Sequence, residues 1–449
     1  MRAWVLGVLA AVTAGTGGCG DDVTLIDARD AATPSDGAAD AGVGRDAALD
    51  GGADTGPERL HPARYAVERT HSPLTPFVVE NLRSIRSRGA ELRDDVFAKV
   101  GDSITVSDAF LRCLAGTPNL DGRDELRPTL DHFRAGDAAG TTPYERVSAA
   151  AGVGWTAGRA LEGTPSPIEQ EVEAIAPAEA LVMFGTNDVG FVSLEDYAES
   201  LFDVVDALLD RGVVPVLSTI PARADDAAID ARVPRFNLAV RAIAQARQVP
   251  LVDLHFALQS LPNRGLGDDG VHPSVAGSGA CDFRAEGLAG GFNVRNLVSV
   301  EALDRTRRAL DEAAAPDPAG PALDGDGSPE APFVIDRLPF THAANTAFGT
   351  HRDLDVYSGC AATQDESGPE YLYRLELAVP RELWIRVLDR GEVDIDVHLL
   401  SAPTEAGCIE RAHRELEVSL PAGTYYLALD TFVSDRELAG EYLLIVAER

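Results

Sequence analysis

The 449-residue chain has few methionines, few aromatic residues and few basic residues. It contains 2 Met and 6% aromatic residues, and 39 Lys and Arg stand against 72 Asp and Glu, for a formal net charge of −33. This acidity argues against nucleic acid and against an anionic membrane surface as partners. After the N-terminus no apolar run approaches the roughly 20 residues of a transmembrane helix. A membrane would therefore be reached through a lipid anchor only.

Cysteine is also scarce, with five residues in the chain. The sequence contains no Cys-x-x-Cys pair and no Cys/His cluster of the kind that binds a metal ion. We therefore expect no metal site and no cofactor. Apart from Cys19, the cysteines are Cys113, Cys281, Cys360 and Cys408. An even number outside the cytosol indicates disulfides. Of the three possible connectivities, the simplest pairs Cys113 with Cys281 in the middle region and Cys360 with Cys408 in the last.

Residues 1–19 have the pattern of a secretory signal peptide, with Arg2, a short apolar run and small residues before Cys19. Cys19 is a candidate for lipidation, although Thr16 departs from the usual lipoprotein pattern and an ordinary cleaved signal is the alternative. We expect an exported bacterial protein, either a cell-envelope lipoprotein or secreted. Residues 20–59 are mostly Ala, Gly and Asp, which predicts a disordered linker.

Residues 60–315 alternate short apolar runs with amphipathic segments. Strands are expected before Ser103 and at 180–184, 213–220 and 250–254, and helices at 76–88, 106–114, 168–175, 194–209 and 229–247. Residues 123–136 are polar and are interpreted as a loop. This alternation is typical of a parallel sheet covered on both faces and predicts a three-layer α/β/α domain.

Residues 316–330 are rich in Pro, Ala, Gly and Asp and predict a second linker. Residues 331–449 then change to short runs in which apolar and polar residues alternate, with turns between them. The runs lie at 371–377, 383–388, 393–399, 415–420, 424–429 and 441–446. Such a pattern without helices predicts a small all-β sandwich domain.

Four polar motifs fall at the expected carboxyl ends of strands or in the loops beyond them. Gly101-Asp102-Ser103 ends the first strand, Gly154 lies in a glycine-rich turn, Asn187 follows the next strand, and His272 lies in Asp269-Gly-Val-His-Pro. The carboxyl edge is where α/β sheets bind ligands. Individually, Ser103 and Asn187 could cap helices and Asp269-Gly270 could be an ordinary turn. Four such motifs on one edge favour a catalytic site.

Acyl transfer needs a nucleophile, a base, a group that orients the base, and donors to an oxyanion. We expect Ser103 to be the nucleophile, His272 the base and Asp269 the group that orients it. The oxyanion donors would be the Ser103 and Gly154 N–H groups and the Asn187 amide, with Gly152 as the alternative to Gly154.

In this order the motifs resemble the SGNH (GDSL) hydrolase family over residues 94–276. The resemblance implies a flavodoxin-like α/β/α fold and ester hydrolysis. It places the four residues for which the family is named on Ser103, Gly154, Asn187 and His272, and the Asp of its Asp-x-x-His motif on Asp269. The glycine block is the loosest match.

Neighbouring polar and aromatic residues are given structural roles. We expect Asp102 to shape the nucleophile turn and Asp188 to hold its loop. His255 follows a strand without a supporting motif and is interpreted as structural. Tyr144 and Trp155 could line a substrate pocket, but packing is the simpler interpretation.

The last domain resembles bacterial pre-peptidase C-terminal domains, through its Tyr-Tyr-Leu hairpin and the Asp394-Ile-Asp396 strand. The resemblance implies a secreted accessory module that binds a polymer or a surface. Asp353, Asp355, Asp394 and Asp396 could offer carboxylates to Ca²⁺, but solvated strand faces are the favoured interpretation.

The sequence therefore predicts an exported serine esterase. Its substrate would be an ester carried by a small molecule, a lipid or an acetylated glycan. The alternative is a non-catalytic cell-surface binding or adhesion protein that retains the hydrolase fold.

Overall fold

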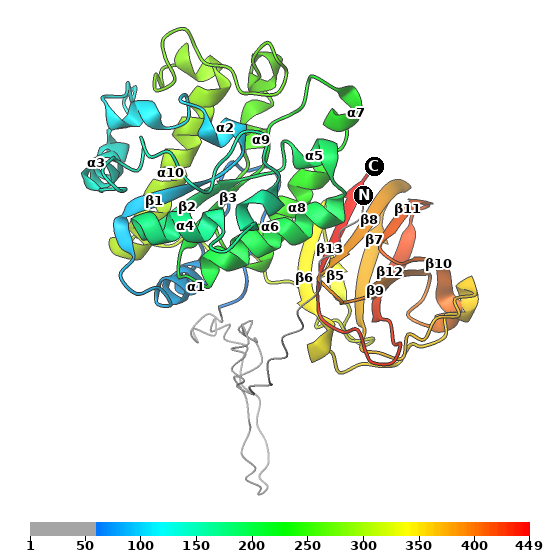
Figure 1. The fold of residues 1–449 in the computed structure, drawn as a ribbon. Coiled ribbons are helices and arrows are strands. Elements are labelled where there is room, and N and C mark those ends of the chain that lie inside the picture. Colours follow the sequence, from blue (N-terminus) through cyan, green and yellow to red (C-terminus); the bar gives the residue numbers. More distant parts are fainter. Residues whose placement is uncertain (1–59) are drawn as a thin grey trace, which may run out of the picture. The chain divides into compact units, whose positions relative to one another are not determined.

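The computed structural model describes residues 60–449 (Figure 1). The expected signal peptide, the 20–59 linker and the lipidation candidate Cys19 lie outside these residues. Within 60–449, no helix combines the length and the apolar character needed to cross a membrane.

A four-stranded parallel sheet forms the centre of the N-terminal part of the described chain, in the order β1-β2-β3-β4. Its strands are β1 (Arg93–Gly101), β2 (Pro177–Met183), β3 (Val214–Ser218) and β4 (Leu251–Val252). Every residue of β2 is buried, as expected for a parallel strand covered on both faces.

The longer helices form two groups, each packed on the sheet (Figure 1). One group is α1 (Pro76–Arg86), α3 (Arg127–Ala135) and α10 (Gly291–Asp311), and the other is α4 (Pro167–Ile175), α6 (Leu194–Leu209) and α8 (Val233–Ala246). The predicted three-layer α/β/α architecture is confirmed. Short helices complete the domain: α2 (Ser103–Val106), α5 (Asp188–Phe191), α7 (Ala227–Asp230), α9 (Leu254–Leu258), and 3₁₀ turns at 112–115, 124–126, 157–161, 262–265 and 287–289.

Two local predictions were wrong. The helix expected over 106–114 ends at Val106, because Ser107 leaves the helical conformation with ψ of 135°, and only a short 3₁₀ turn follows at 112–115. The segment 123–136, expected as a loop, contains helix α3. Its polar composition concealed a narrow apolar stripe in which Phe133 packs edge-on against Phe97, with ring centroids 5.1 Å apart.

The C-terminal part is a sandwich of two sheets, in the orders β10-β9-β12-β7-β5 and β11-β8-β13-β6. The strands are β5 (Phe333–Ile335), β6 (Phe340–Asn345), β7 (Tyr371–Leu377), β8 (Arg381–Asp389), β9 (Ile395–Leu400), β10 (Cys408–Ala412), β11 (Glu415–Leu420), β12 (Gly423–Thr431) and β13 (Glu441–Glu448); short 3₁₀ turns lie at 346–348, 358–360 and 405–407. A core of apolar side chains from both sheets lies between them. The predicted β-sandwich is confirmed, although β5, β6 and β10 were not expected.

Candidate active site

Ser103 is the first residue of α2, directly after β1. The fully buried Asp102 caps the helix, its Oδ1 accepting from the Ile104 N–H at 3.0 Å. Burial raises the pKa of Asp102 to about 6. A Cβ at Gly101 would lie 2.5 Å from the Met183 carbonyl oxygen, so the close approach of β1 and β2 requires glycine there. The structure thus gives Asp102 the turn-shaping place that was expected and leaves Ser103 half-buried.

Ser103, His272 and Asp269 form a continuous hydrogen-bonded chain. Ser103 Oγ lies 2.9 Å from His272 Nε2, and His272 Nδ1 lies 2.7 Å from Asp269 Oδ2. Because an ionised carboxylate only accepts, the proton of the neutral imidazole belongs on Nδ1. The Nε2 lone pair then faces the serine hydroxyl, which is the arrangement that general-base catalysis requires.

The Asp269 carboxylate also organises the loop that carries His272. Its Oδ1 accepts from the Val271 and His272 N–H groups, each at 3.0 Å. Partial burial by itself would raise the pKa of the Asp269 carboxyl group. The hydrogen bonds from Val271 and His272 lower it by more, so the pKa lies below its ordinary value. Gly270 has φ of 70°, and a Cβ there would lie 2.7 Å from the Asp225 nitrogen, so the turn requires glycine.

The glycine block begins beside the nucleophile turn. The Gly152 N–H donates to the Gly101 carbonyl at 3.0 Å, and the Gly152 carbonyl accepts from the Trp155 N–H at 3.3 Å. Gly154 is the third residue of this turn and has φ of 75°, the position at which a type II turn needs glycine. Since the Gly152 N–H is already bonded to Gly101, the alternative oxyanion role for Gly152 is disfavoured.

Asn187 does not cap helix α5 through its side chain. Its Nδ2 instead donates to the Trp155 carbonyl at 2.9 Å. The adjacent Asp188 accepts from the Ala157 N–H at 2.9 Å, in keeping with the expected loop-holding role. The end of β2 is therefore tied to the glycine turn, which is itself tied to Gly101. The helix-cap interpretation of Asn187 does not hold.

The remaining expected residues have structural surroundings. Tyr144 is fully buried and packs edge-on against Phe97 at 5.4 Å, so it does not line a pocket. Trp155 is half-buried in the glycine turn. His255 lies in α9, where its N–H donates to Thr219 Oγ1 at 3.0 Å and burial lowers the pKa of its imidazole.

Arg295 was not identified from the sequence, yet its buried guanidinium supports α2 from helix α10. It donates to the Ile104 carbonyl at 2.6 Å and to Thr105 Oγ1 at 2.9 Å, and it lies 3.6 Å from the centroid of the Phe110 ring. Burial lowers the pKa of Arg295 to about 9. Arg295 lies among other polar residues of α10. These residues weaken the amphipathic pattern by which the helix could have been recognised in the sequence.

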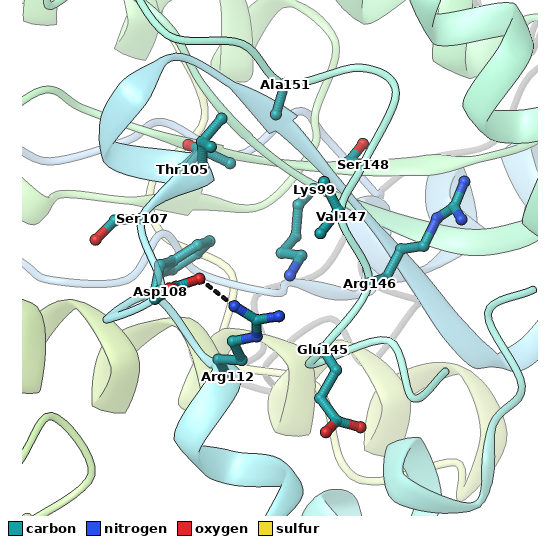
Figure 2. Close-up of a pocket in the computed structure, with 12 residues that line it drawn as sticks. Lys99, Thr105, Ser107, Asp108, Arg112, Glu145, Arg146, Val147, Ser148 and Ala151 are labelled. Atoms are coloured by element: carbon teal, nitrogen blue, oxygen red, sulfur yellow. Dashed lines mark hydrogen bonds and ion pairs between the residues drawn. The ribbon is translucent and has the colours of Figure 1, made fainter. Parts of the chain in front are cut away.

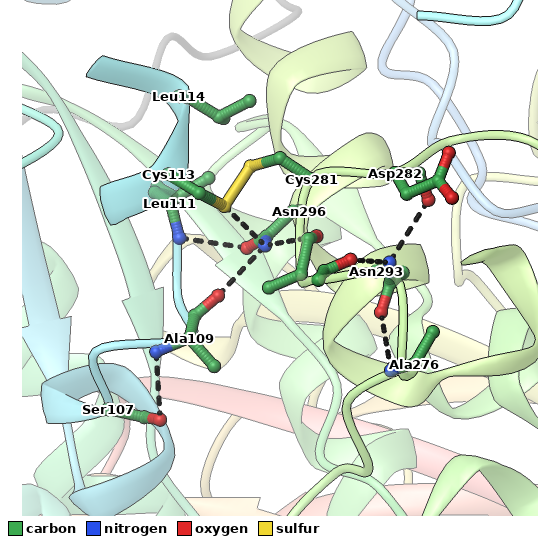
Figure 3. The surroundings of a disulfide bond; sticks show 12 residues. Ser107, Ala109, Leu111, Cys113, Leu114, Ala276, Cys281, Asp282, Asn293 and Asn296 are labelled. Carbon is green, nitrogen blue, oxygen red and sulfur yellow. Dashed lines mark hydrogen bonds between the residues drawn. A yellow bond between two sulfur atoms is a disulfide. The ribbon is translucent and has the colours of Figure 1, made fainter. Parts of the chain in front are cut away.

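Two asparagines of α10 hold the segments that follow Ser103 and His272 in the chain (Figure 3). Asn296 accepts from the Leu111 N–H at 2.9 Å and donates to the Ala109 and Ala280 carbonyls at 2.9 and 3.0 Å. Asn293 accepts from the Ala276 N–H at 3.2 Å. The Cys113–Cys281 disulfide joins the same two segments, and Cys360 pairs with Cys408 in the sandwich. This is the pairing that the positions of the cysteines favoured.

A pocket lies beside α2 and is lined by charged, polar and apolar side chains (Figure 2). Lys99 of β1 enters it and donates to the Tyr144 carbonyl at 2.9 Å. Burial lowers the pKa of Lys99 to about 8. Arg112, Glu145 and Arg146 also line this pocket, together with the apolar Val106, Phe110, Val147 and Ala151.

Residues 100–280 match the model of the GDSL-like lipase/acylhydrolase family. This part of the chain belongs to that family. The GDSL-like match contains the serine, glycine turn, asparagine and histidine described above, and the chain is a hydrolase that acts on ester bonds. A search of curated proteins found no match.

Several solved structures are similar to parts of the chain. A GDSL-like lipase from Bacteroides thetaiotaomicron is 13% identical and covers 51% of this chain and 97% of its own, with a TM-score of 0.31. An acetylxylan esterase from Geobacillus stearothermophilus is 21% identical and covers 48% and 95%, with a TM-score of 0.31. The pre-peptidase C-terminal domain of a Bacillus anthracis collagenase is 16% identical and covers 24% and 89%, with a TM-score of 0.17.

Proposed function

We propose that the chain is an exported serine esterase in which Ser103, His272 and Asp269 act together. The observation that carries this proposal is the hydrogen-bonded chain from Ser103 Oγ through His272 to Asp269, with distances of 2.9 and 2.7 Å. Ser103 and His272 are 169 residues apart in the sequence, so their contact is a result of the fold and not of closeness along the chain.

In the first step, His272 Nε2 takes the serine proton while Ser103 Oγ bonds to the ester carbonyl carbon. The tetrahedral intermediate collapses, the alcohol leaves with the proton from His272, and an acyl-serine remains. Water then attacks this ester with His272 as the base, which releases the acid and restores Ser103. Asp269 stabilises the imidazolium that forms in both steps.

The oxyanion would be bound by the Ser103 N–H, the Gly154 N–H and the Asn187 amide. Two features support this assignment. The Asn187 amide has two hydrogens and the bond to Trp155 occupies one of them, so the second can serve a ligand. Gly154 is exposed in a turn whose first residue is paired with Gly101, immediately before the nucleophile turn.

The proposal is tested with p-nitrophenyl acetate and a fluorophosphonate probe. Ser103→Ala should abolish turnover and probe labelling while leaving the circular dichroism spectrum unchanged. Ser87→Ala is the matched control, since this exposed serine at the end of α1 donates to the Ser84 carbonyl at 2.6 Å and does not line the pocket beside α2. Near-normal turnover by Ser103→Ala, or failure of the probe to label Ser103 in the wild type, would refute the proposal and favour the non-catalytic binding protein.

For the substrate we propose an ester with a short acyl group, such as the acetyl ester of a carbohydrate, a lipid or a small molecule. The pocket beside α2 mixes apolar side chains with the charged side chains of Lys99, Arg112 and Arg146, and a long alkyl chain would be poorly matched to these charges. Val153 and Phe191 are 75% and 78% exposed close to Gly154 and Asn187 in the chain, and could contact the alcohol part. Turnover should fall from p-nitrophenyl acetate to octanoate, and activity on acetylated xylan and on triacetin distinguishes glycan from lipid-like alcohols.

For localisation we propose export through the 1–19 signal, with Cys19 as the lipidated residue. The two disulfides are typical of an oxidising compartment. Metabolic labelling with palmitate should mark the wild type and not Cys19→Ala.

We also propose that residues 60–315 and 331–449 are separate domains joined by residues 316–330, and that the second binds a polymer or a surface. Limited proteolysis should cut first within 316–330. Full-length Ser103→Ala should sediment with insoluble acetylated glycan, without hydrolysing it, if the surface is a polysaccharide.

A further inference from the structure

The sandwich buries a group of ionisable side chains that the proposed hydrolysis does not use. Glu366 precedes β7, and Asp396 and His398 belong to β9; their exposed fractions are 0%, 3% and 0%. We propose that these three side chains bind a Zn²⁺ ion that ties the 361–370 loop to the sheet. No metal was expected from the sequence, because it has no Cys-x-x-Cys pair and no Cys/His cluster.

The geometry suits a single small ion. Asp396 and His398 are two residues apart on one strand, so their side chains share a face of the sheet. One ligand atom from each of the three residues lies within 4.8 Å of the others, and His398 Nε2 is 3.8 Å from Glu366 Oε1. Two ligand atoms at about 2.1 Å from the same zinc ion lie up to about 4.2 Å apart. Small side-chain rotations would therefore complete the site.

The imidazole of His398 lacks any hydrogen-bond partner. Neither ring nitrogen has one, nor does Glu366 Oε2, although both residues are fully buried. Tyr357 stacks on the imidazole with ring centroids 3.5 Å apart and an interplanar angle of 10°, which fixes the plane of the ring. Buried polar atoms are normally paired, so a rigid, unpaired imidazole facing two carboxylates indicates a missing ligand.

A cation already contacts the two carboxylates of this group, the guanidinium of Arg411. Arg411, which faces His398 across the β9–β10 pairing, contacts Asp396 and lies 3.4 Å from Glu366. Its side chain is 19% exposed, so the guanidinium can move toward solvent. Arg411 and a metal ion would compete for the same carboxylates.

The donor set distinguishes among metals. One imidazole nitrogen and two carboxylate oxygens form a three-ligand set of the kind that zinc takes, with a fourth position left over. Calcium prefers six to eight oxygen ligands, which this set does not provide. The structure also corrects the interpretation of Asp396 as part of a solvated strand face, since it is 3% exposed.

A second group shares Asp396 and serves as a comparison. His413 Nδ1 lies 3.0 Å from Asp394 Oδ1 and 3.2 Å from Asp396 Oδ1. The His413 side chain is 53% exposed, and its contacts with the two carboxylates are already made. It does not present an unpaired buried nitrogen, so we assign the ion to His398.

The test uses the full exported chain, stripped with a chelator and with both disulfides intact. Intact disulfides matter because Cys360 and Cys408 also lie beside His398. Isothermal titration with ZnCl₂ should give one site per chain, and Co²⁺ should produce an intense visible absorption band. Glu366→Gln and His398→Gln should each weaken binding at least tenfold. Arg411→Gln should tighten it, because the competing cation is removed.

His342→Gln is the matched control, since this histidine of the same sandwich bonds the Tyr373 hydroxyl at 2.9 Å. It should bind Zn²⁺ like the wild type, as should His413→Gln. If His398→Gln does not fold, Glu366→Gln decides the question. Absence of Zn²⁺ binding, preference for Ca²⁺ over Zn²⁺, or loss of binding in His413→Gln but not in Glu366→Gln would each overturn the proposal.

Discussion

The side-chain amide of Asn187 donates to the carbonyl of Trp155 at 2.9 Å, which fixes the asparagine against the glycine turn. This contact orients the amide without the rotational freedom of an exposed side chain. A donor that is already oriented stabilises developing charge without reorganisation during the reaction.

Replacing Asn187 tests its role as an oxyanion donor. Asn187→Ala should lower kcat for p-nitrophenyl acetate by about 10²–10³ with little change in KM, since the oxyanion forms only in the transition state. Asp188→Asn is the control: it keeps an oxygen that can accept from the Ala157 N–H and should retain near-normal kcat. Equal losses in both variants would mean that Asn187 only holds the loop.

Arg295 is expected to position the nucleophile helix. Arg295→Met removes the donors to the Ile104 carbonyl and Thr105 Oγ1, and the resulting shift of α2 should lower kcat by about tenfold to a hundredfold with a smaller effect on KM. Arg305→Met changes another α10 arginine, which bonds the Ser72 carbonyl at 3.0 Å, and should leave kcat unchanged. Steady-state kinetics well below the unfolding temperature separate this effect from lost stability.

Glu179 should make the stability of the protein fall as pH rises. This glutamate of β2 is 1% exposed, and burial raises its pKa from 4.5 to about 8. Between these pH values the folded state binds more protons than the unfolded state, so the free energy of unfolding decreases by up to about 1.4 kcal/mol per pH unit.

Glu179→Gln should therefore match the wild type near pH 4.5 and become more stable than it toward pH 8. Urea unfolding of both proteins at several pH values measures the difference, in which the contributions of other titrating groups cancel. Glu173→Gln changes an exposed glutamate of α4 and should show no such trend. A constant difference between Glu179→Gln and the wild type would contradict the expectation.

The two disulfides should differ in their contribution to stability. They close loops with sequence separations of 168 and 48 residues. Loss of a native disulfide typically costs about 2–5 kcal/mol, and the chain-entropy model makes the longer loop about 1 kcal/mol more stabilising. Denaturant unfolding of Cys113→Ala/Cys281→Ala and Cys360→Ala/Cys408→Ala should show this order. The reverse order would indicate that strain or residual structure outweighs loop entropy.

Much of the architecture could be predicted because it depends on local patterns. The helix expected at 194–209 and the strand expected at 415–420 have the observed bounds, since periodicity and turn residues specify them. Helix α10 was not expected, because it buries Asn293, Arg295 and Asn296 and so lacks a clear apolar face. The end of α2 at Val106 and the helix at 127–135 were likewise not apparent from the local pattern.

The candidate site shows the same division. Local motifs were enough to select Ser103, Asn187, Asp269 and His272, because a strand-to-helix turn and the polar ends of parallel strands carry recognisable residues. The other features of the site depend on long-range contacts. These are the hydrogen bond from Asn187 to the Trp155 carbonyl, the hydrogen bond from the Gly152 N–H to the Gly101 carbonyl, and the hydrogen bonds from Arg295 to α2. These contacts join residues that are far apart in the sequence and meet only when the chain folds. The spacing of residues in the sequence does not give the distances between them in the folded protein. The unpaired His398 facing Glu366 belongs to this second class, since burial and the absence of a partner are properties of the packed molecule.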